Sequence, residues 1–214
     1  MSPAVPRGRF VTLEGIEGAG KSTVAKFICA WLARRSIPTR LTREPGGTPL
    51  AETLRGVVLG RGGEPMSAVS ETLLMFAARG VHLENLIRPA LERGDWVICD
   101  RFTDATRAYQ GAGRGVDAEL IETLARAVHG GLAPDCTLLL DLSVSVGLAR
   151  ARGRAGGGAP QDRFEDETAA FFERVRAGYL ELARREPGRF HVVDAAAGRT
   201  EVEAQVSAVL EKLL

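Results

Sequence analysis

The sequence is poor in cysteine, which argues against two common ways of holding a small fold together. Its 214 residues include only Cys29, Cys99 and Cys136, with no C-x-x-C pair and no histidine at a zinc-ligand spacing. An odd number of widely spaced cysteines argues against a disulfide framework and against a zinc site. We expect reduced thiols that pack as small buried hydrophobic groups.

Long apolar runs and an excess of charge are lacking as well. No stretch approaches the ~20 apolar residues of a membrane-spanning helix, and residues 1–9 have no apolar segment typical of a secretory signal. A formal net charge of +1 excludes a strongly polycationic nucleic-acid binder. We therefore expect a soluble, cytoplasmic protein without a membrane or nucleic-acid partner.

Lysine is also scarce, since all 28 basic residues except Lys21, Lys26 and Lys212 are arginine. The remaining composition is ordinary, with 45% hydrophobic and 26% charged residues, and a chain of this length can bury a sizeable core. Length and composition together predict a single domain over residues 1–214.

Short apolar runs alternate with longer segments of helical periodicity. The runs at 10–13, 96–99, 137–142 and 190–193 are predicted strands, as is the segment 39–43, which the turn residues 45–47 close. Residues 21–35, 50–58, 70–93, 117–128 and 171–182 are predicted helices. Pro89 should kink or divide the third helix, and the capping-box pattern of Thr200 and Glu203 predicts the start of a last helix. This alternation favours a three-layer α/β domain, with a parallel sheet of about five strands between helices.

A phosphate-binding loop lies between the first predicted strand and helix, where residues 15–22 match G-x-x-x-x-G-K-[ST]. Its glycines let backbone N–H groups turn toward phosphate, and the next helix presents its N-terminus. Lys21 should reach the β- and γ-phosphates, and the Ser22 hydroxyl should ligate Mg²⁺. The predicted ATP-binding residues are Gly15, Ile16, Glu17, Gly18, Ala19, Gly20, Lys21, Ser22 and Thr23.

A phosphate loop identifies a nucleoside triphosphate as ligand without identifying a reaction. The only asparagine, Asn85, is followed by Leu86, so the N-K-x-D motif of guanine-specific GTPases is lacking. Large DNA-dependent or transport ATPases usually need a longer chain. A small transferase that moves the γ-phosphoryl group to a second substrate remains.

Three further segments carry a family resemblance: T-R-E-P-G-G-T at 42–48, D-R-F at 100–102 and A-Y-Q-G-A-G-R-G at 108–115. Together with the phosphate loop they resemble the thymidylate kinases (dTMP kinases), over nearly the whole chain. The resemblance implies a P-loop nucleoside-monophosphate-kinase-like fold and the ATP- and Mg²⁺-dependent phosphorylation of dTMP to dTDP, in dTTP biosynthesis. It also implies a homodimer.

Several charged residues suit a phosphorylated acceptor. A nucleoside monophosphate is dianionic, and Arg43 and Arg101 follow predicted strands, where ligands bind in open α/β sheets. Asp100, at a strand end, suits the Mg²⁺ site. Glu17 is costly beside polyphosphate unless arginine or Mg²⁺ offsets its charge, and the resemblance places it at the sugar or phosphate edge of the acceptor.

The resemblance also assigns residues to the base and sugar of the acceptor. Arg79 matches an arginine that bonds thymine, and an aromatic residue stacks on the base in the family where Met75 stands here. Either Met75 or Phe76 then packs on the base. The substrate-binding residues implied are Glu17, Arg43, Pro45, Met75, Phe76, Arg79, Arg101, Thr106, Tyr109 and Gln110.

An arginine-rich segment at about 150–163 is a predicted lid. Arg150, Arg152, Arg154 and Arg163 flank three consecutive glycines, and the phosphate loop itself has no arginine, as in the bacterial type of the family with lid arginines. Arginines that close over transferring phosphates neutralise developing charge. The catalytic residues that we expect are Lys21, Arg101, Arg154 and Arg163.

No general base is required, because the second pKa of a phosphate is about 6 and the acceptor is mostly deprotonated near pH 7. His82, His129 and His191 are accordingly expected to be structural or exposed. Two alternatives stay open. A kinase for another nucleotide or nucleoside would prefer dUMP or thymidine, and a P-loop binding protein would bind ATP without forming a product.

Overall fold

A five-stranded parallel sheet forms the centre of the described chain. The computed structural model describes residues 7–60, 64–155, 164 and 167–214, with the side chains of residues 154 and 155 left out. The sheet order is β2-β3-β1-β4-β5, with β1 at Phe10–Glu14, β2 at Thr39–Arg43, β3 at Trp96–Asp100, β4 at Cys136–Asp141 and β5 at Phe190–Asp194. The predicted α/β class and the parallel sheet are therefore confirmed.

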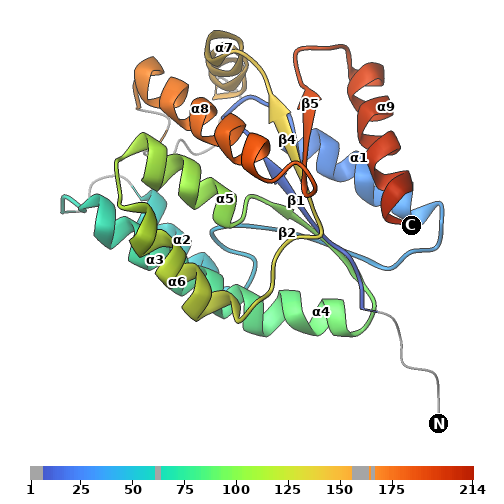
Figure 1. Ribbon diagram of the computed structural model, residues 1–214, viewed down its shortest axis with the longest axis horizontal. Coiled ribbons are helices and arrows are strands. Elements are labelled where there is room, and N and C mark those ends of the chain that lie inside the picture. The colour runs from blue at the N-terminus through green and yellow to red at the C-terminus, as the bar shows by residue number, and fades with distance from the viewer. Residues whose placement is uncertain (1–6, 61–63, 156–163, 165–166) are drawn as a thin grey trace.

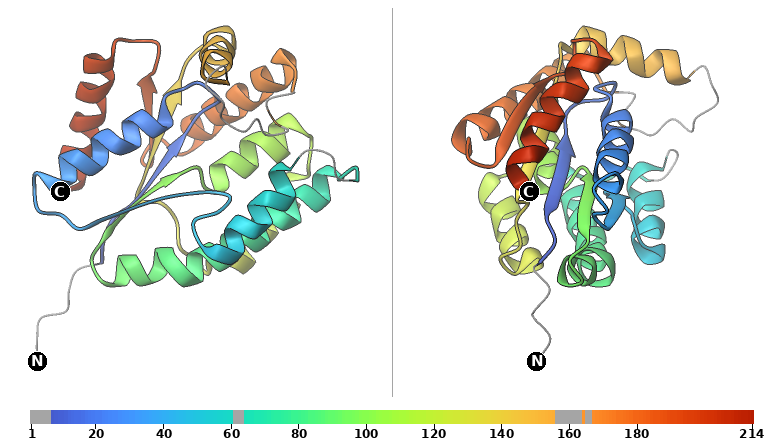
Figure 2. Two further views of the ribbon diagram at one scale, coloured as in Figure 1. Left: turned by 180° about the vertical axis from the view of Figure 1, so that it is seen from behind. Right: turned by 90° about the vertical axis from the view of Figure 1, so that its right-hand side faces the viewer.

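Helices cover both faces of this sheet (Figures 1 and 2). One face carries α1 (Lys21–Ala33) and α9 (Arg199–Leu210), which pack on each other. The other face carries α3 (Ala68–His82), α4 (Arg88–Glu92), α5 (Thr103–Thr106), α6 (Ala118–His129) and α8 (Ala169–Arg185). α2 (Pro49–Leu59) packs on α3, and α7 (Val144–Ala155) follows β4.

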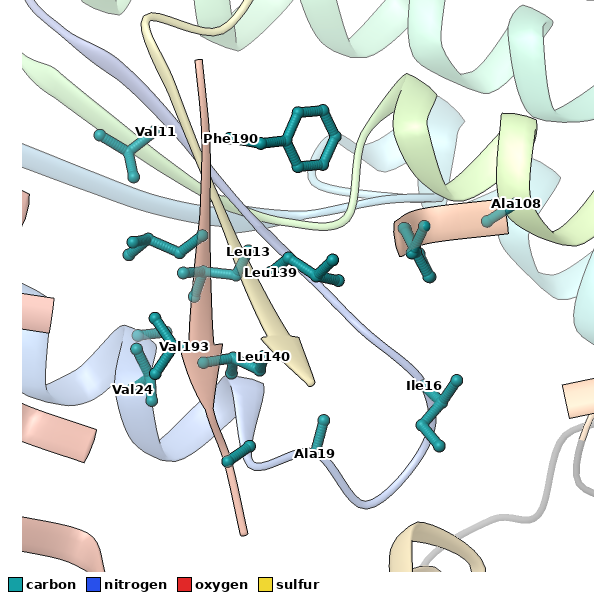
Figure 3. Close-up of a cluster of buried hydrophobic side chains, with 14 of the residues drawn as sticks. Val11, Leu13, Ile16, Ala19, Val24, Ala108, Leu139, Leu140, Phe190 and Val193 are labelled. Atoms are coloured by element: carbon teal, nitrogen blue, oxygen red, sulfur yellow. The ribbon is translucent and has the colours of Figure 1, made fainter. Parts of the chain in front are cut away.

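The central strands are apolar on both faces because both are covered. β1 is buried along its whole length, and its alternate residues Val11 and Leu13 join a core that includes Val24, Leu140 and Val193 (Figure 3). Phe10 faces the other way and packs with residues of α4 and β3. Cys99 and Cys136 are buried free thiols, as expected, and Cys29 is partly buried. No helix in the described residues is long and apolar enough to cross a membrane.

Two helix boundaries show where sequence patterns succeed and fail. The predicted helix is irregular before Pro89, since a π-helical turn at Leu83–Ile87 lies between α3 and α4. The backbone stays helical through this turn, so Pro89 does not end the helix. The Thr200/Glu203 capping box is wrong, because α9 begins after Gly198. Glu201 accepts from the Gly198 N–H at 3.2 Å, while Glu203 pairs with Arg199.

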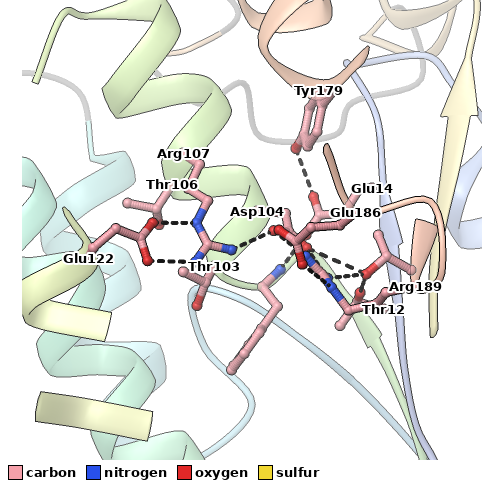
Figure 4. A network of polar contacts seen from close by, with 12 residues as sticks. Thr12, Glu14, Thr103, Asp104, Thr106, Arg107, Glu122, Tyr179, Glu186 and Arg189 are labelled. Atoms are coloured by element: carbon pink, nitrogen blue, oxygen red, sulfur yellow. Dashed lines mark hydrogen bonds and ion pairs between the residues drawn. The ribbon is translucent and has the colours of Figure 1, made fainter. Parts of the chain in front are cut away.

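A buried carboxylate on α5 bonds to residues at the β4–β5 side of the sheet (Figure 4). Asp104 is 1% exposed and pairs with Arg107 at 2.8 Å and with Arg189 at 2.6 Å. Burial alone would raise the pKa of Asp104, but the hydrogen bond and charge of Arg189 bring it below the usual value. Thr137 joins the group by accepting from Arg189 at 2.7 Å. The network connects α5 with β4 and with the segment before β5.

Removing this carboxylate should destabilise the fold strongly, because Arg107 and Arg189 would each lose a buried partner and keep only the more exposed Glu122 and Glu186. We expect Asp104→Ala to lower the free energy of unfolding by about 3 kcal/mol, measured by urea denaturation. Glu203→Ala, which removes a surface pair with Arg199, serves as the control and should cost less than about 1 kcal/mol. Similar losses in the two variants would contradict this account.

Candidate active site

The phosphate loop follows β1 and leads into the N-terminus of α1. Gly18 has φ of +78°, and a Cβ there would lie 2.0 Å from the carbonyl oxygen of Gly147, so only glycine fits. Gly20 caps α1 with φ of +91° and, within the described residues, no side chain caps the helix. The first N–H groups of α1 are thereby left for an anion, which is what the predicted phosphate-binding role requires.

Lys21 is held inside this loop. Its side chain is buried, and Nζ donates to the carbonyl oxygens of Gly15 and Ile16, both at 3.1 Å. Burial and the positive charge of Arg101 lower the pKa of Lys21 to about 8. An ammonium group in this position is available to a negatively charged ligand at the loop.

A cleft beside the loop contains the predicted metal-binding pair. Ser22 and Asp100 both line it, and the buried Oδ1 of Asp100 has no hydrogen-bond partner among the described residues. The described residues hold no group of three or more His, Cys, Asp or Glu side chains that could bind a metal. A hydroxyl and one carboxylate still suit Mg²⁺, which keeps waters and binds through one or two protein groups plus substrate phosphates.

Arg101 connects the phosphate loop with the elements around it. Its backbone has φ of +69°, a conformation that is strained for a residue other than glycine and is typical of functional positions. Nη1 donates to the Gly15 carbonyl at 3.0 Å and to the Tyr179 hydroxyl at 3.1 Å. Nη2 donates to Glu17 and to the Tyr109 hydroxyl, both at 2.9 Å.

Buried polar groups keep this guanidinium in place. Tyr179, from α8, donates to Glu14 Oε2 at 2.7 Å, and the Phe102 N–H donates to Glu14 Oε1 at 2.8 Å. Burial and the negative charge of Asp104 raise the pKa of Glu14 to about 8. Tyr109 donates to Glu17 Oε2 at 2.8 Å. Because Arg101 pairs with the same carboxylate, it offsets the negative charge of Glu17, as the sequence predicts for an acid beside polyphosphate.

A cavity opens next to Arg101, between α2, α3 and the segment after β3. It gathers most of the predicted acceptor residues and several that the sequence did not single out. Its lining consists of Glu17, Glu44, Pro45, Arg55, Leu59, Met75, Arg79, Arg101, Phe102, Ala105, Thr106, Tyr109, Gln110 and Phe164.

Arg79 is one of the charged groups that line this cavity, and it is only 2% exposed. Nε donates to Glu44 at 2.7 Å, and Nη2 donates to the Phe102 carbonyl and to the Thr106 hydroxyl. Nη1 is buried without a hydrogen-bond partner among the described residues. A buried donor normally has a partner, so this nitrogen marks the place where an acceptor group of a ligand fits.

The geometry distinguishes the two residues between which the sequence left a choice. Met75 lines the cavity. Phe76 does not belong to the lining; its ring packs under Arg79, with the guanidinium carbon 4.8 Å from the ring centroid. Phe102, which sequence analysis placed only within the D-R-F motif, lines the cavity instead.

The remaining predicted residues are bonded to other protein groups, lie apart from the cavity, or fall outside the described residues. Arg43 is exposed, pairs with Glu52 at 3.0 Å, and lines the Ser22 cleft. Gln110 lines the cavity while its amide donates to Glu71 at 2.7 Å. The side chain of Arg154 and the whole of Arg163 lie outside the described residues, as does most of the predicted lid. The part of that lid at residues 150–155 belongs to α7.

Two charged residues of the cavity, Glu44 and Arg55, were not predicted from the sequence. Glu44 lies inside the T-R-E-P-G-G segment and is 5% exposed, and the motif gave no sign that its carboxylate holds Arg79. Arg55 belongs to α2 and donates to the Pro45 carbonyl at 2.8 Å. A helical projection of α2 would place Arg55 one turn after Ala51, which is fully buried, and this signal was available in the sequence.

The guanidinium of Arg101 thus contacts the phosphate loop and also lines the cavity that contains the buried Arg79. Such an arrangement suits a nucleoside triphosphate at the loop and a second small, anionic ligand in the cavity. These features define an ATP-dependent phosphotransferase of the P-loop class that acts on a nucleoside monophosphate.

Comparison with known proteins identifies the family within this class. The family model for thymidylate kinase matches residues 13–206, and the chain belongs to this family. The thymidylate kinase of Teredinibacter turnerae is 52% identical over 97% of this chain and 99% of its own. The thymidylate kinase of Alkalilimnicola ehrlichii is 55% identical over 97% of this chain and 93% of its own. A crystal structure of thymidylate kinase from Ehrlichia chaffeensis superposes with a TM-score of 0.75 at 33% identity, over 96% of this chain and 99% of that chain.

The lowered pKa of Lys21 predicts how nucleotide affinity changes with pH. A polyphosphate favours the charged ammonium, so binding should weaken as pH rises above about 8, where free Lys21 loses its proton. The dissociation constant of ATP should then rise by up to about tenfold per pH unit, measured by titration calorimetry between pH 7 and 9.5.

Lys21→Arg is the matched control for this titration, because its guanidinium stays charged throughout the range. The control also retains Glu14, whose pKa is about 8 as well. An equal rise of the dissociation constant in both proteins would assign the pH dependence to another group.

Proposed function

We propose that the site transfers the γ-phosphoryl group of ATP to the phosphate of dTMP, giving dTDP and ADP in dTTP synthesis. The observation that carries this proposal is Arg101, whose two nitrogens bond the phosphate-loop carbonyl of Gly15 on one side and Glu17 and Tyr109 of the cavity on the other. A donor and an acceptor bound on the two sides would meet at this guanidinium. Phosphoryl transfer requires little beyond such positioning and charge stabilisation.

The donor side would hold ATP with Mg²⁺. Residues 15–23, with Lys21 among them, would bind the phosphates, and Ser22 and Asp100 would hold the metal. The partnerless Oδ1 of Asp100 in the Ser22 cleft supports this assignment. When bound, Mg²⁺ neutralises the charge of the β- and γ-phosphate oxygens.

The acceptor side would bind dTMP in the cavity next to Arg101. Arg79, Thr106, Tyr109 and Gln110 would surround the base and sugar, with Met75 against the base and Phe76 packed behind Arg79. Pro45 and Glu17 would border the nucleotide. Arg101 and Arg43 would attract its phosphate, and Arg43 would first have to leave Glu52, to which it bonds at the surface.

The lid would complete the charge around the transferring group. We assign Arg154 and Arg163 to it on the resemblance of residues 150–163, within a single P-loop kinase domain spanning 1–214. No general base enters the scheme, since the acceptor phosphate is mostly deprotonated near pH 7. His82 and His129 are bonded to Thr42 and Thr103 inside the fold, which supports a structural use of both.

A homodimer in the cytoplasm is part of the same proposal. Its support in the described residues is a row of exposed apolar side chains on α2 and α3, namely Leu50, Val57, Val69 and Leu73, each 45% exposed or more. The two helices pack on each other, and by helical spacing Leu50 and Val57 share one face of α2, as Val69 and Leu73 share one face of α3. Contiguous exposed apolar residues commonly mark a protein–protein interface.

A coupled assay for ADP tests the reaction, with ATP and Mg²⁺ present and dTMP, dUMP, dCMP, dGMP, AMP or thymidine offered separately. We expect turnover with dTMP, weaker turnover with dUMP, and loss of activity when EDTA removes Mg²⁺. Lys21→Ala should lower kcat at least about 100-fold, because charge stabilisation of the phosphates is lost. Preference for another acceptor would overturn the base site, and ATP binding without ADP release would indicate a binding protein.

Sedimentation tests the dimer. We expect the wild-type chain to sediment at twice its 22.9 kDa and Leu73→Glu to shift toward the monomer, because a buried unpaired carboxylate is costly. Val192→Glu, at another exposed apolar residue on β5, is the control and should leave the dimer intact. A monomeric wild-type protein would refute the proposal.

A further inference from the structure

His82 takes no part in the chemistry above, yet its side chain is fully buried beside the acceptor cavity. It lies on α3, one turn after Arg79, so both side chains project from the same face of the helix. Its two ring nitrogens are both used: Nδ1 contacts Glu44 Oε1 at 3.0 Å, and Nε2 contacts the Thr42 hydroxyl at 2.7 Å.

We infer that His82 is a positioning residue that orients Arg79 for the acceptor nucleotide through Glu44. The inference rests on the proposed function and assigns a residue on which acceptor recognition depends without contact to the acceptor. A chain of three bonds carries it, from Thr42 through His82 and Glu44 to Arg79.

The direction of these bonds follows from the chemistry of the groups. Burial alone would raise the pKa of Glu44, but Arg79 and His82 bring it below the usual value, so the group is a carboxylate that accepts only. His82 Nδ1 therefore donates to Oε1, while Oε2 accepts from Arg79 Nε at 2.7 Å. Nε2 shares a hydrogen bond with the Thr42 hydroxyl, which can either donate or accept. Every polar atom between Thr42 and the Arg79 Nε is thereby satisfied.

This chain fixes the plane of the Arg79 guanidinium at two edges. Glu44 holds Nε, and the Phe102 carbonyl and the Thr106 hydroxyl hold Nη2 at 3.2 and 3.1 Å. The side chains of Arg79 and Glu44 are each 3% exposed. Nη1 is the nitrogen left for a ligand, and its direction depends on how Glu44 is oriented. A carboxylate bonded on one oxygen only could rotate and carry the guanidinium with it.

The backbone of the T-R-E-P-G-G segment is built closely around the histidine. Gly47 has φ of +88°, and a Cβ at this position would lie 2.4 Å from His82 Nε2 and 2.5 Å from the Thr42 hydroxyl oxygen. A side chain at residue 47 would therefore break the Thr42–His82 bond. The segment thus supplies the hydroxyl, the carboxylate and the clearance that the imidazole needs.

Two substitutions at His82 separate positioning from packing. His82→Leu fills the space without hydrogen bonds, whereas His82→Asn restores an N–H donor near the place of Nδ1. We expect His82→Leu to raise KM for dTMP about 10- to 100-fold, with KM for ATP changed less than about threefold. His82→Asn should recover most of the dTMP affinity. Equal increases in both KM values, or no rescue by asparagine, would indicate a merely structural role.

A double-mutant cycle isolates the path through Arg79. In an Arg79→Met background no guanidinium remains to be positioned, so adding His82→Leu should change KM for dTMP less than about twofold. Effects that multiply instead would show that His82 acts on the acceptor by another route.

A substrate-free measurement makes the inference independent of the acceptor's identity. The Arg79 Nε–H can be assigned in nitrogen-15 spectra by its loss in Arg79→Met, and its hydrogen exchange reports the bond to Glu44. We expect exchange at least about tenfold faster in His82→Leu and near wild type in His82→Asn. Unchanged exchange in His82→Leu would overturn the positioning role. Failure of the wild-type protein to turn over dTMP would refute the proposed function instead. The exchange measurement would still decide whether His82 positions Arg79.

Discussion

The bonds of Arg101 are the interaction on which the site depends. Its backbone turns into a left-handed conformation directly after β3, and this turn brings the guanidinium back over the end of β1, where the Gly15 carbonyl accepts from it. Neighbouring parallel strands end at the same edge of the sheet, so the pairing of β1 with β3 brings the two loops together. The backbone strain is offset by the bonds to Glu17, Tyr109 and Tyr179.

Charged groups are buried around this centre in a consistent way, each with a partner of opposite sign or with directed hydrogen bonds. Arg79 pairs with Glu44, and Asp104 pairs with Arg107 and Arg189. Removing one partner of a buried ion pair costs much more free energy than the formation of the pair contributes to stability. Such pairs therefore restrict the arrangement of α3, α5 and β5 more than they add net stability.

The sequence predicted the fold well and the site in part, for physical reasons. Short apolar runs identified β1, β3 and β4, which are buried almost throughout because both faces of the sheet are covered there. The largely exposed β2 has a single apolar residue and was located by the turn residues that follow it. The glycines of the phosphate loop marked backbone that other residues cannot adopt. Periodicity does not reveal pairing between distant side chains. The carboxylate of Glu44 reaches an arginine 35 residues later, and nothing in the T-R-E-P-G-G motif indicates that partner.

Competition between neighbouring residues and the shortness of some elements explain the remaining differences between the predicted and the observed structure. Both Glu201 and Glu203 are acidic residues near the start of α9, and backbone geometry selected Glu201. Short segments such as α5, with only four residues, carry too little periodicity to be found. The choice between Met75 and Phe76 depends on helix rotation of one residue, which tertiary packing decides.

The bonds of Lys21 to two carbonyl oxygens of its own loop have a consequence for the entropy of ligand binding. A long, flexible side chain that was free would lose up to about 2 kcal/mol of rotamer entropy when a phosphate captured it. Here Nζ is already held at Gly15 and Ile16, so most of that ordering is completed when the chain folds. A phosphate oxygen accepts the same hydrogen bond as a carbonyl oxygen, so little further ordering of the side chain is needed when a nucleotide binds.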